Sequence, residues 1–353
     1  MAIYLDHAAS TPISDISLAE FNKQLQRIGN PSSLHNFGRD QRRALEDARE
    51  NIATFIDCAP SEIIFTGSGT EADNLAIKGL YWKSGKKVIV ISAFEHKAVL
   101  EPAEWLVEKE GAELIQIPIT KDGIVDLDFL KDLVAKRGSE IALISVMHSN
   151  NEIGAIQPIE KVIEIAGDIP VHSDAVQSLL KVPVTFKGLT ALSISAHKVG
   201  GPVGVGALVL KRGLDIPALL HGGGQERDVR SGTLHTPSIA AFAVAAELSQ
   251  QRLLENEVRI RSLRERLIRG ITTTVTDVRV NGGSETLPGI AHFTFAGAEG
   301  DALLLLLDAQ GVQCSTGSAC SAGIAQPSHV LLAMGMAPKV ARSSIRFSIG
   351  ATT

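Results

Sequence analysis

Short apolar runs alternate with longer amphipathic segments over the first two-thirds of the chain, and this order strongly constrains the fold. The runs are rich in β-branched residues, and several are apolar without interruption, as strands covered on both faces are. They are EIIFTG (62–67), KVIVISA (87–93), IALISVMH (141–148), IPVHSD (169–174), ALSISA (191–196) and VGALVLK (205–211). Helical patterns lie between the early runs, at 38–57, 70–80 and 100–111. This order predicts an α/β fold with a mostly parallel sheet flanked by helices.

The pattern changes after about Pro237. A long stretch is typical of one or two helices, and apolar strands then resume at 289–295 and 343–350. We therefore expect a smaller α+β domain beside the large one. The predicted large domain spans 15–245, and the predicted small domain combines 1–14 with 246–353. The glycine-rich stretch 221–233 is expected to be a long loop, and such loops are often functional.

Composition excludes several classes of partner. The net charge is −5 with both signs interspersed, so we expect neither a nucleic-acid nor a membrane-surface partner. Runs of about eighteen apolar residues, which could span a bilayer, are not found. The N-terminus lacks the basic-then-apolar pattern of a secretory signal. Three cysteines in a long chain favour a reducing compartment, so the sequence predicts a cytoplasmic protein.

Polar residues follow the strands, where ligands bind in open parallel sheets. Gly69 and Thr70 begin a predicted helix, whose N–H groups and hydroxyl suit a phosphate, although an ordinary helix cap uses the same residues. His96 follows the second strand and could stack on an aromatic ligand, or be a plain loop histidine. Asn150 and Asn151 follow the third strand and supply amide groups, or simply form a turn.

An acid and a lysine follow the next two strands. Asp174 is costly there unless it meets a cation, with Gln177 three residues on, although a helix-capping aspartate is also plausible. Lys198 ends the segment Ser195-Ala196-His197-Lys198, and a desolvated lysine amine can form a Schiff base, unless it only pairs with an acid. A phosphate cradle, a ring contact, an acid and a lysine along one sheet are what pyridoxal 5'-phosphate needs.

With these residues assembled, the chain resembles the cysteine desulfurases of the NifS/IscS type, within the fold type I pyridoxal phosphate enzymes. The resemblance runs from YLDHAASTP (4–12) to SSIRFSIG (343–350), through GNPSSLH, TEADNLAIKG, EHKAVL, MHSNNEIGAIQPI, HSDAVQS, SISAHKVGGPVGVGAL, GGGQERDVRSGT and STGSACSAG. It implies a homodimer that converts L-cysteine to L-alanine. The sulfur would pass to an acceptor protein such as an iron–sulfur scaffold, for cluster assembly or tRNA thiolation.

The resemblance also implies roles around the cofactor ring and its phosphate. Lys198 would form the Schiff base and take the substrate's α proton, Asp174 would pair with the pyridine nitrogen, and Gln177 with the ring hydroxyl. His96 would stack on the ring and assist proton transfer. The phosphate would be held by residues at two strand ends and by one from the neighbouring subunit of the dimer: Gly69, Thr70, Ser195, His197 and the neighbour's copy of Thr233.

Further roles concern the substrate and the cysteines. Asn151, which would also contact the cofactor, and Arg346 would hold the substrate carboxylate, since a guanidinium meets a carboxylate bidentately. Cys320 would be the nucleophile that becomes the persulfide, on what its small and polar neighbours predict to be a loop. Cys58 and Cys314 are interpreted as structural. No metal site is expected, apart from Cys320 as a conceivable ligand of an iron–sulfur cluster.

Two other functions stay open. One is a different enzyme of the same fold, such as a selenocysteine lyase or an aminotransferase, although the loop around Cys320 is unnecessary for the latter. The other is a catalytically idle scaffold that binds sulfur-transfer partners, which an intact Lys198, Asp174 and Cys320 argue against. Asp73 stands where many relatives have asparagine, and no role is assigned to it. The family usually continues into a further helix after 343–350, so no acceptor-docking role of that helix is expected from these residues.

Overall fold

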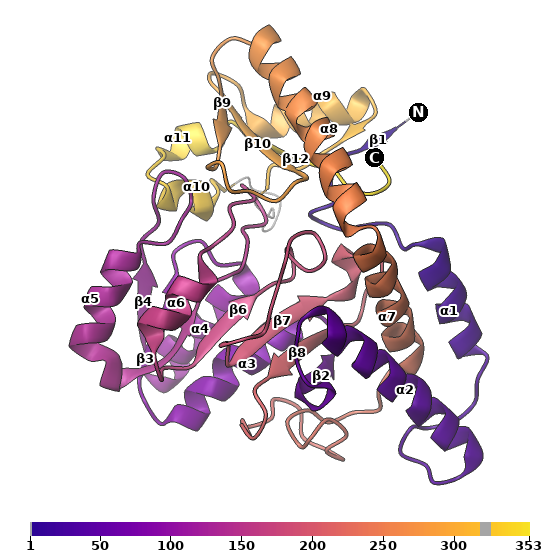
Figure 1. Cartoon of the computed structure of the whole chain (residues 1–353). Coiled ribbons are helices and arrows are strands. Elements are labelled where there is room, and N and C mark those ends of the chain that lie inside the picture. Colours follow the sequence, from indigo (N-terminus) through magenta and orange to yellow (C-terminus); the bar gives the residue numbers. More distant parts are fainter. Residues whose placement is uncertain (1, 318–325) are drawn as a thin grey trace.

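The computed structural model describes residues 2–317 and 326–353, and its centre is a seven-stranded sheet in the order β2-β8-β7-β6-β5-β3-β4 (Figure 1). Strand β8 is antiparallel to its neighbours β7 and β2, whereas the other neighbours pair in parallel. The strands are β2 (Ile63–Thr66), β3 (Val88–Ser92), β4 (Glu113–Ile117), β5 (Ile141–Ser145), β6 (Val171–Asp174), β7 (Ala191–Ser195) and β8 (Gly206–Leu210). All six predicted runs form strands, and the mostly parallel α/β architecture is confirmed.

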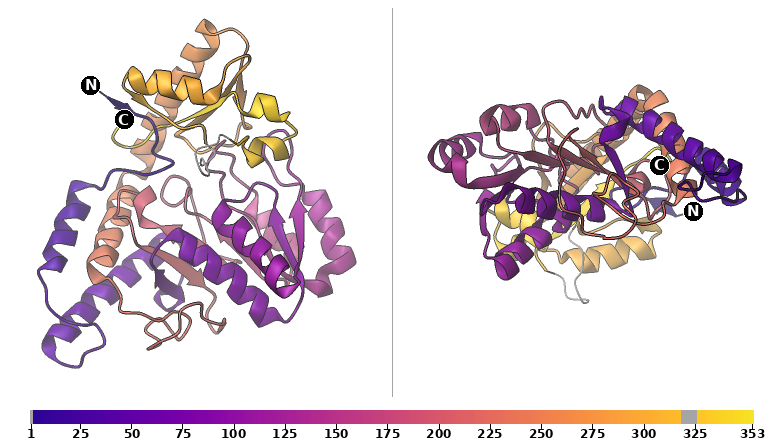
Figure 2. Two further views of the ribbon diagram at one scale, coloured as in Figure 1. Left: turned by 180° about the vertical axis from the view of Figure 1, so that it is seen from behind. Right: turned by 90° about the horizontal axis from the view of Figure 1, so that it is seen from below.

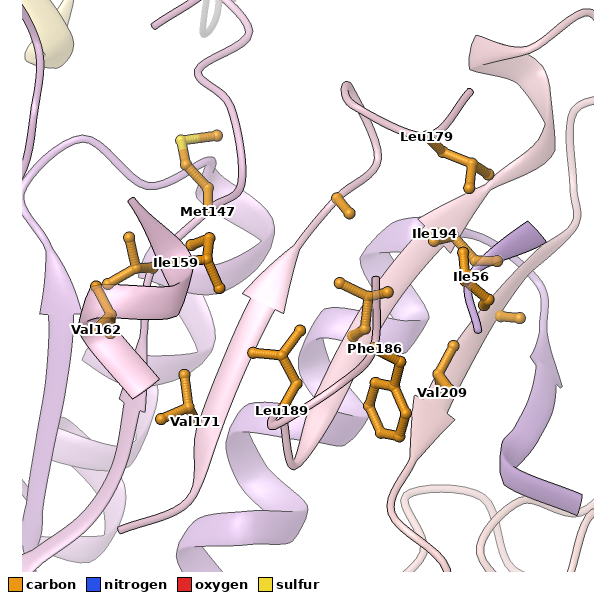
Figure 3. Packing of buried hydrophobic residues seen from close by; sticks show 14 of the residues in the cluster. Ile56, Met147, Ile159, Val162, Val171, Leu179, Phe186, Leu189, Ile194 and Val209 are labelled. Carbon is orange, nitrogen blue, oxygen red and sulfur yellow. The ribbon is translucent and has the colours of Figure 1, made fainter. Parts of the chain in front are cut away.

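Helices cover both faces of this sheet because its strands are buried on both sides. Alternate residues of one strand enter different cores, as Ile63 and Ile64 do. One core is covered by α2 (Asn36–Phe55), α5 (Leu127–Arg137), α6 (Ile159–Ala166) and α7 (Thr236–Gln251), and Figure 3 shows part of it. The other is covered by α3 (Gly69–Ser84) and α4 (Lys97–Glu110), which lie in front of the sheet in the view from behind in Figure 2.

Strand β4 was not predicted from the sequence. It pairs only with β3 at the edge of the sheet, so its side chains are partly exposed and its sequence, ELIQI, mixes charged and apolar residues. Helix α1 (Asp15–Leu25) was also missed. Ser14 caps it by accepting a hydrogen bond from the Ser17 N–H, and Ser17 Oγ donates to the Ala241 carbonyl of α7 at 2.8 Å. Short amphipathic segments such as these carry weaker periodic signals than long helices.

The C-terminal part builds a second, antiparallel sheet in the order β12-β10-β9, above the large sheet in Figure 1. Its own apolar core lies against α8 and α9. The elements are α8 (Leu253–Thr274), β9 (Val278–Asn281), β10 (Ile290–Phe295), α9 (Gly300–Ala309), β11 (Val312–Gln313), α10 (His329–Ala333), α11 (Pro338–Ala341) and β12 (Ser344–Ser348). The long helical stretch after Pro237 is thus two helices that meet at Arg252.

The N-terminal residues join this second sheet. Strand β1 (Ile3–Tyr4) pairs in parallel with β11, and Asp6 forms a bridge to Ser348 beside β12. The domain bounds at residues 15 and 245 stay a prediction. Within the described ranges, no helix is both long and apolar enough to cross a bilayer.

The glycine-rich stretch 221–233 is a loop with one isolated bridge, between Glu226 and Arg230. Two ion pairs attach it to the large domain. Buried Glu226 binds both terminal nitrogens of Arg49 on α2, at 2.9 and 2.7 Å, and Arg230 pairs with Glu71 on α3 at 2.8 Å. The loop is therefore held in a defined place without regular secondary structure.

Candidate active site

A cavity of about 400 Å³ lies at the carboxyl ends of the parallel strands of the large sheet. Strands β3, β5, β6 and β7 run in the same direction, so the segments that follow them meet at one edge. Many of the residues singled out in the sequence line this cavity: Gly69, Thr70, His96, Asn151, Asp174, Gln177, Ser195, His197, Lys198 and Arg346. The structure therefore brings together side chains that lie as much as 277 positions apart in the chain, from Gly69 to Arg346.

Lys198 ends a short 3₁₀ turn that follows β7. Its Nζ donates hydrogen bonds to the carbonyls of Ala8 and Ala9, at 2.6 and 2.7 Å. Burial is the main cause that lowers the pKa of this amine to about 8, and the positive charge of Arg346 adds to the effect. A sizeable fraction of the amine is therefore neutral near physiological pH, which is the form that attacks a carbonyl.

Asp174 ends β6 and is 5% exposed. Its Oδ1 accepts a hydrogen bond from the Val176 N–H at 2.8 Å. Burial raises the pKa of this carboxyl, while His96, the Val176 N–H and Lys198 act to lower it. A buried carboxylate that faces a cavity is well placed for a cationic ligand group, because pairing offsets the cost of desolvation.

His96 caps the N-terminus of α4, and its Nδ1 accepts the Ala98 N–H at 3.1 Å. The neutral ring therefore carries its proton on Nε2. Surrounding protein lowers the pKa of this imidazole by excluding water, although the negative charge of Asp174 opposes the shift. A neutral, correctly oriented imidazole can lie against a ring and relay a proton.

The N-terminus of α3 faces the same cavity. Ser68 caps it by accepting the Glu71 N–H at 3.1 Å, and Gly69 and Thr70 begin the helix. A Cβ on Gly69 would lie 2.8 Å from Val176 Cγ2, so only glycine leaves this turn undisturbed. Free N–H groups and the helix dipole make this end suitable for a phosphate. Ser195 and His197 line the cavity nearby.

Arg346 of β12 reaches the cavity from the small sheet and is 4% exposed. Its Nη2 donates to Asp6 Oδ1 at 2.7 Å, and its Nη1 donates to the Asn151 carbonyl at 2.9 Å. Its Nε is buried and has no hydrogen-bond partner among the residues that the structure describes. Gln177 also contacts the N-terminal segment, because its Nε2 donates to the Ala8 carbonyl at 2.7 Å. The guanidinium therefore keeps one donor available for a carboxylate.

Two predicted residues do not line the cavity of their own chain. Thr233 is exposed and lies beside a different hollow, shared with Asn30, Pro31 and Ser32. Cys320 lies outside the described residues, although Ser315 and Gly317, which precede it, do line the cavity.

The other two cysteines are partly buried. Chiefly through burial, the pKa of Cys58 rises to about 12 and that of Cys314 to about 11. Both therefore stay thiols at neutral pH, and a thiol is a weak nucleophile.

The sequence reasoning missed several buried polar residues behind the cavity wall. Asp73 on α3 and Glu95, directly before His96, are both 1% exposed, and His172 on β6 is fully buried. Glu152 is 2% exposed and accepts a 2.5 Å hydrogen bond from Ser328 Oγ. The available signal was position: Asp73 follows the phosphate turn by three residues, and Glu95 adjoins a predicted site residue.

The side chains present fit pyridoxal phosphate. A buried acid, a lysine amine with a lowered pKa and an open helix N-terminus are the donors that its ring nitrogen, aldehyde and phosphate require. The fit rests on this chemistry and on the orphaned Arg346 Nε, which a bound carboxylate could satisfy.

Comparison with known proteins agrees with this chemistry. The Aminotransferase class-V family matches residues 3–353. An IscS-like cysteine desulfurase of Mycobacterium tuberculosis is 48% identical, over 99% of this chain and 92% of the relative. A solved NifS-like protein matches with a TM-score of 0.92 and 34% identity, over 99% of this chain and 94% of its own. A structure described as SspA in complex with cysteine matches with a TM-score of 0.85 and 33% identity, over 98% of both chains.

These matches extend over nearly the whole chain, and identity of this level excludes a likeness of fold alone. The chain therefore belongs to the class-V aminotransferase family and, within it, to the pyridoxal phosphate-dependent cysteine desulfurases of the IscS/NifS type.

Proposed function

We propose that this cysteine desulfurase binds pyridoxal phosphate and L-cysteine in the cavity at the edge of the large sheet, and transfers the sulfur of cysteine to Cys320. The observation that carries the proposal is the meeting of Lys198, Asp174 and the N-terminus of α3 in one cavity. Bound there, the cofactor would supply an electron-withdrawing ring that stabilises negative charge at the substrate's Cα.

Lys198 would hold the cofactor aldehyde and then move the α proton. To do so its amine must leave the carbonyls of Ala8 and Ala9, which bind it at 2.6 and 2.7 Å. Its pKa of about 8 makes the neutral, nucleophilic form accessible. His96, with its proton on Nε2, would lie against the ring and assist proton transfer.

Asp174 would pair with the ring nitrogen and keep it protonated, and Gln177 would bind the ring hydroxyl. Gly69, Thr70, Ser195 and His197 would hold the phosphate, and Asn151 would also contact the cofactor. All of them line the cavity. The charge of a phosphate would be stabilised there by the dipole of α3 and by its free N–H groups.

Arg346 would bind the substrate carboxylate together with Asn151. The substrate would compete with Asp6 for Arg346 Nη2 and would engage the free Nε, which gives a bidentate pair. This exchange needs no new charge in the site, because one carboxylate replaces another beside the same guanidinium.

Cys320 would attack the sulfur of bound cysteine as a thiolate. The new bond joins the two sulfur atoms, the Cβ–sulfur bond breaks, and its electron pair returns to the carbon, which after protonation leaves as part of alanine. Gly317 lines the cavity, and three residues of extended chain span roughly 10 Å, so Cys320 is within covalent reach. The persulfide would then pass to an acceptor protein, such as an iron–sulfur scaffold, in cluster assembly or tRNA thiolation.

A homodimer would complete the site if Thr233 binds the phosphate held by the neighbouring subunit. Thr233 is exposed and shares a hollow with residues 30–32. Large apolar side chains flank that segment and are strongly exposed: Ile28 at 76%, Leu34 at 89% and Phe37 at 61%. A second subunit would cover such a patch. Sedimentation analysis tests this part, and a monomer under all conditions would contradict it. A cytoplasmic location stays a prediction.

The transfer step is tested by intact-protein mass spectrometry after treatment of the loaded enzyme with L-cysteine. We expect one added sulfur in the parent protein and none in Cys320→Ala, while Cys58→Ala loads like the parent. Alanine should appear in step with the added sulfur. Equal loading in Cys320→Ala and the parent would exclude Cys320 as the acceptor of the sulfur, and alanine formation by Lys198→Ala would exclude the role of the lysine.

A further inference from the structure

Three buried carboxyl groups meet behind the cavity wall, and each comes from a different element. Asp73 lies on α3, Glu95 in the turn after β3, and Asp174 at the end of β6. They are 1%, 1% and 5% exposed, and the charge of Asp174 is felt by both of the others. Like charges so close together in a buried place cannot all ionise at neutral pH.

The groups that face these carboxyls favour a charge on Asp174. It lies within electrostatic range of His96 and Lys198, and it accepts the Val176 N–H. Glu95 accepts hydrogen bonds from the Met147 N–H, at 2.7 Å, and from a serine hydroxyl. Burial raises the pKa of Glu95 to about 8, so this side chain is mostly neutral at pH 7.

Asp73 has no cation beside it among the described residues that contact it. The side chain that faces it from β6 is His172, whose Nε2 lies 3.6 Å from Asp73 Oδ1, just beyond hydrogen-bonding distance. Asp73 Oδ1 is buried and has no hydrogen-bond partner within the described ranges. From β7, Ser193 offers a hydroxyl to the carboxyl group. An ionised carboxylate in such surroundings is strongly disfavoured.

His172 does not act as the missing cation. Its Nε2 is 3.0 Å from Ser193 Oγ, and its Nδ1 is 2.9 Å from Ser145 Oγ, so hydroxyl groups satisfy both ring nitrogens. Complete burial lowers the pKa of this imidazole to about 3. It is therefore neutral at every pH at which the protein works, and it offers no positive charge to Asp73.

We propose that Asp73 is a positioning residue held as the neutral acid, so that Asp174 alone among the three carboxyls carries the negative charge that meets the cofactor ring. The proposal rests on the role given to Asp174 above. A second negative charge beside Asp174 would compete for its proton, and would leave Asp174 partly protonated and unable to pair fully with a ring N–H. A neutral Asp73 removes this competition and still supplies the shape and polarity of an amide.

The experiment uses Asp73→Asn, which copies the neutral acid in shape, with surface Asp132→Asn as the matched control. Folding of the cofactor-free protein is measured by denaturant titration at several pH values between about 5 and 7. The unfolded chain loses the Asp73 proton above about pH 4, whereas the folded parent keeps it. The unfolding constant of the parent relative to Asp73→Asn should therefore rise about tenfold per pH unit. Asp132→Asn should show no such trend.

Two further measurements keep the test decisive. The infrared band of protonated carboxyl groups in the cofactor-free parent at pH 7 should lose intensity in Asp73→Asn. The variant should also bind pyridoxal phosphate within about threefold of the parent, since one neutral polar group replaces another. A pH-independent stability difference, an unchanged infrared band, or a tenfold or greater loss of affinity would each overturn the assignment.

Asp174→Asn separates this proposal from the function on which it rests. It should weaken cofactor binding and shift the absorbance of the bound cofactor. If Asp174→Asn binds the cofactor as the parent does, the role of Asp174 falls. The stability and infrared results on Asp73, which are obtained without cofactor, would then still report its protonation.

Discussion

Removal of Arg49 tests how the loop 221–233 is held. The guanidinium, 9% exposed, donates to both carboxylate oxygens of Glu226, which is 2% exposed, and to the Ile63 carbonyl at 2.6 Å. Its Cζ also lies 4.8 Å from the centre of the Phe65 ring. Arg49→Met keeps most of the apolar stem but leaves a buried carboxylate without its cation.

The expected loss of unfolding free energy is about 3–5 kcal/mol, which is typical when one partner of a buried pair is removed. The lost contact with the Phe65 ring adds about 0.5–1 kcal/mol. The Phe65 N–H still binds Glu226, at 2.7 Å, and limits the damage. Since the loop carries Thr233, we also expect weaker cofactor binding if that residue serves a second subunit.

The assay is urea denaturation followed by tryptophan fluorescence. Both tryptophans of the chain, Trp82 and Trp105, lie on α3 and α4 against the large sheet, so the signal reports that domain. Combining Arg49→Met with Glu226→Gln should cost less than the sum of the single changes. Arg137→Gln, at an exposed ion-pair cluster on α5, is the control and should leave the transition unchanged. A loss below about 1 kcal/mol for Arg49→Met would refute the reasoning, because it would equal that of a surface pair.

Two further predictions concern the cofactor cavity. Capture of pyridoxal phosphate by the cofactor-free protein should speed up as pH rises through about 8 and then level off, because the pKa of Lys198 is lowered to about 8 and the neutral amine reacts. Stopped-flow absorbance checks this, and a rate that keeps rising to about pH 10 would indicate an ordinary lysine. Gly206→Ala should cost about 1–3 kcal/mol and weaken cofactor binding, because its Cβ would lie 2.7 Å from the Ser68 backbone at the phosphate turn. Gly270→Ala, with open space around the added carbon, is the control for the same calorimetric and binding measurements.

The strands and much of the site were predictable because both depend on local patterns. A buried parallel strand must be apolar throughout, and the residue after it must lie at the ligand-binding edge, so Asp174 and Lys198 could be placed from the sequence. Edge strand β4 escaped because half-exposed positions tolerate Glu113 and Gln116, which breaks the apolar run.

Other features depend on contacts between distant parts of the chain, which no local pattern records. The pairing of Asp6 with Arg346 joins residues 340 positions apart. Asp73 follows the phosphate turn on a helix and looked like an ordinary helical aspartate, and only its burial between α3, β6 and β7 reveals that its charge has no partner. Polar groups of this kind are costly, so their presence is a better indicator of function than any apolar position.

The first ten residues connect the two sheets mechanically. Asp6 is fixed to the small sheet through Ser348 and Arg346, and the carbonyls of Ala8 and Ala9 hold the amine of Lys198. Any shift of the small sheet is thus transmitted along two or three peptide units to the group that must react. When a substrate displaces Asp6 from the guanidinium, this short tether is free to slacken just as the amine has to leave its carbonyls, which gives the chain a direct way to time the two events.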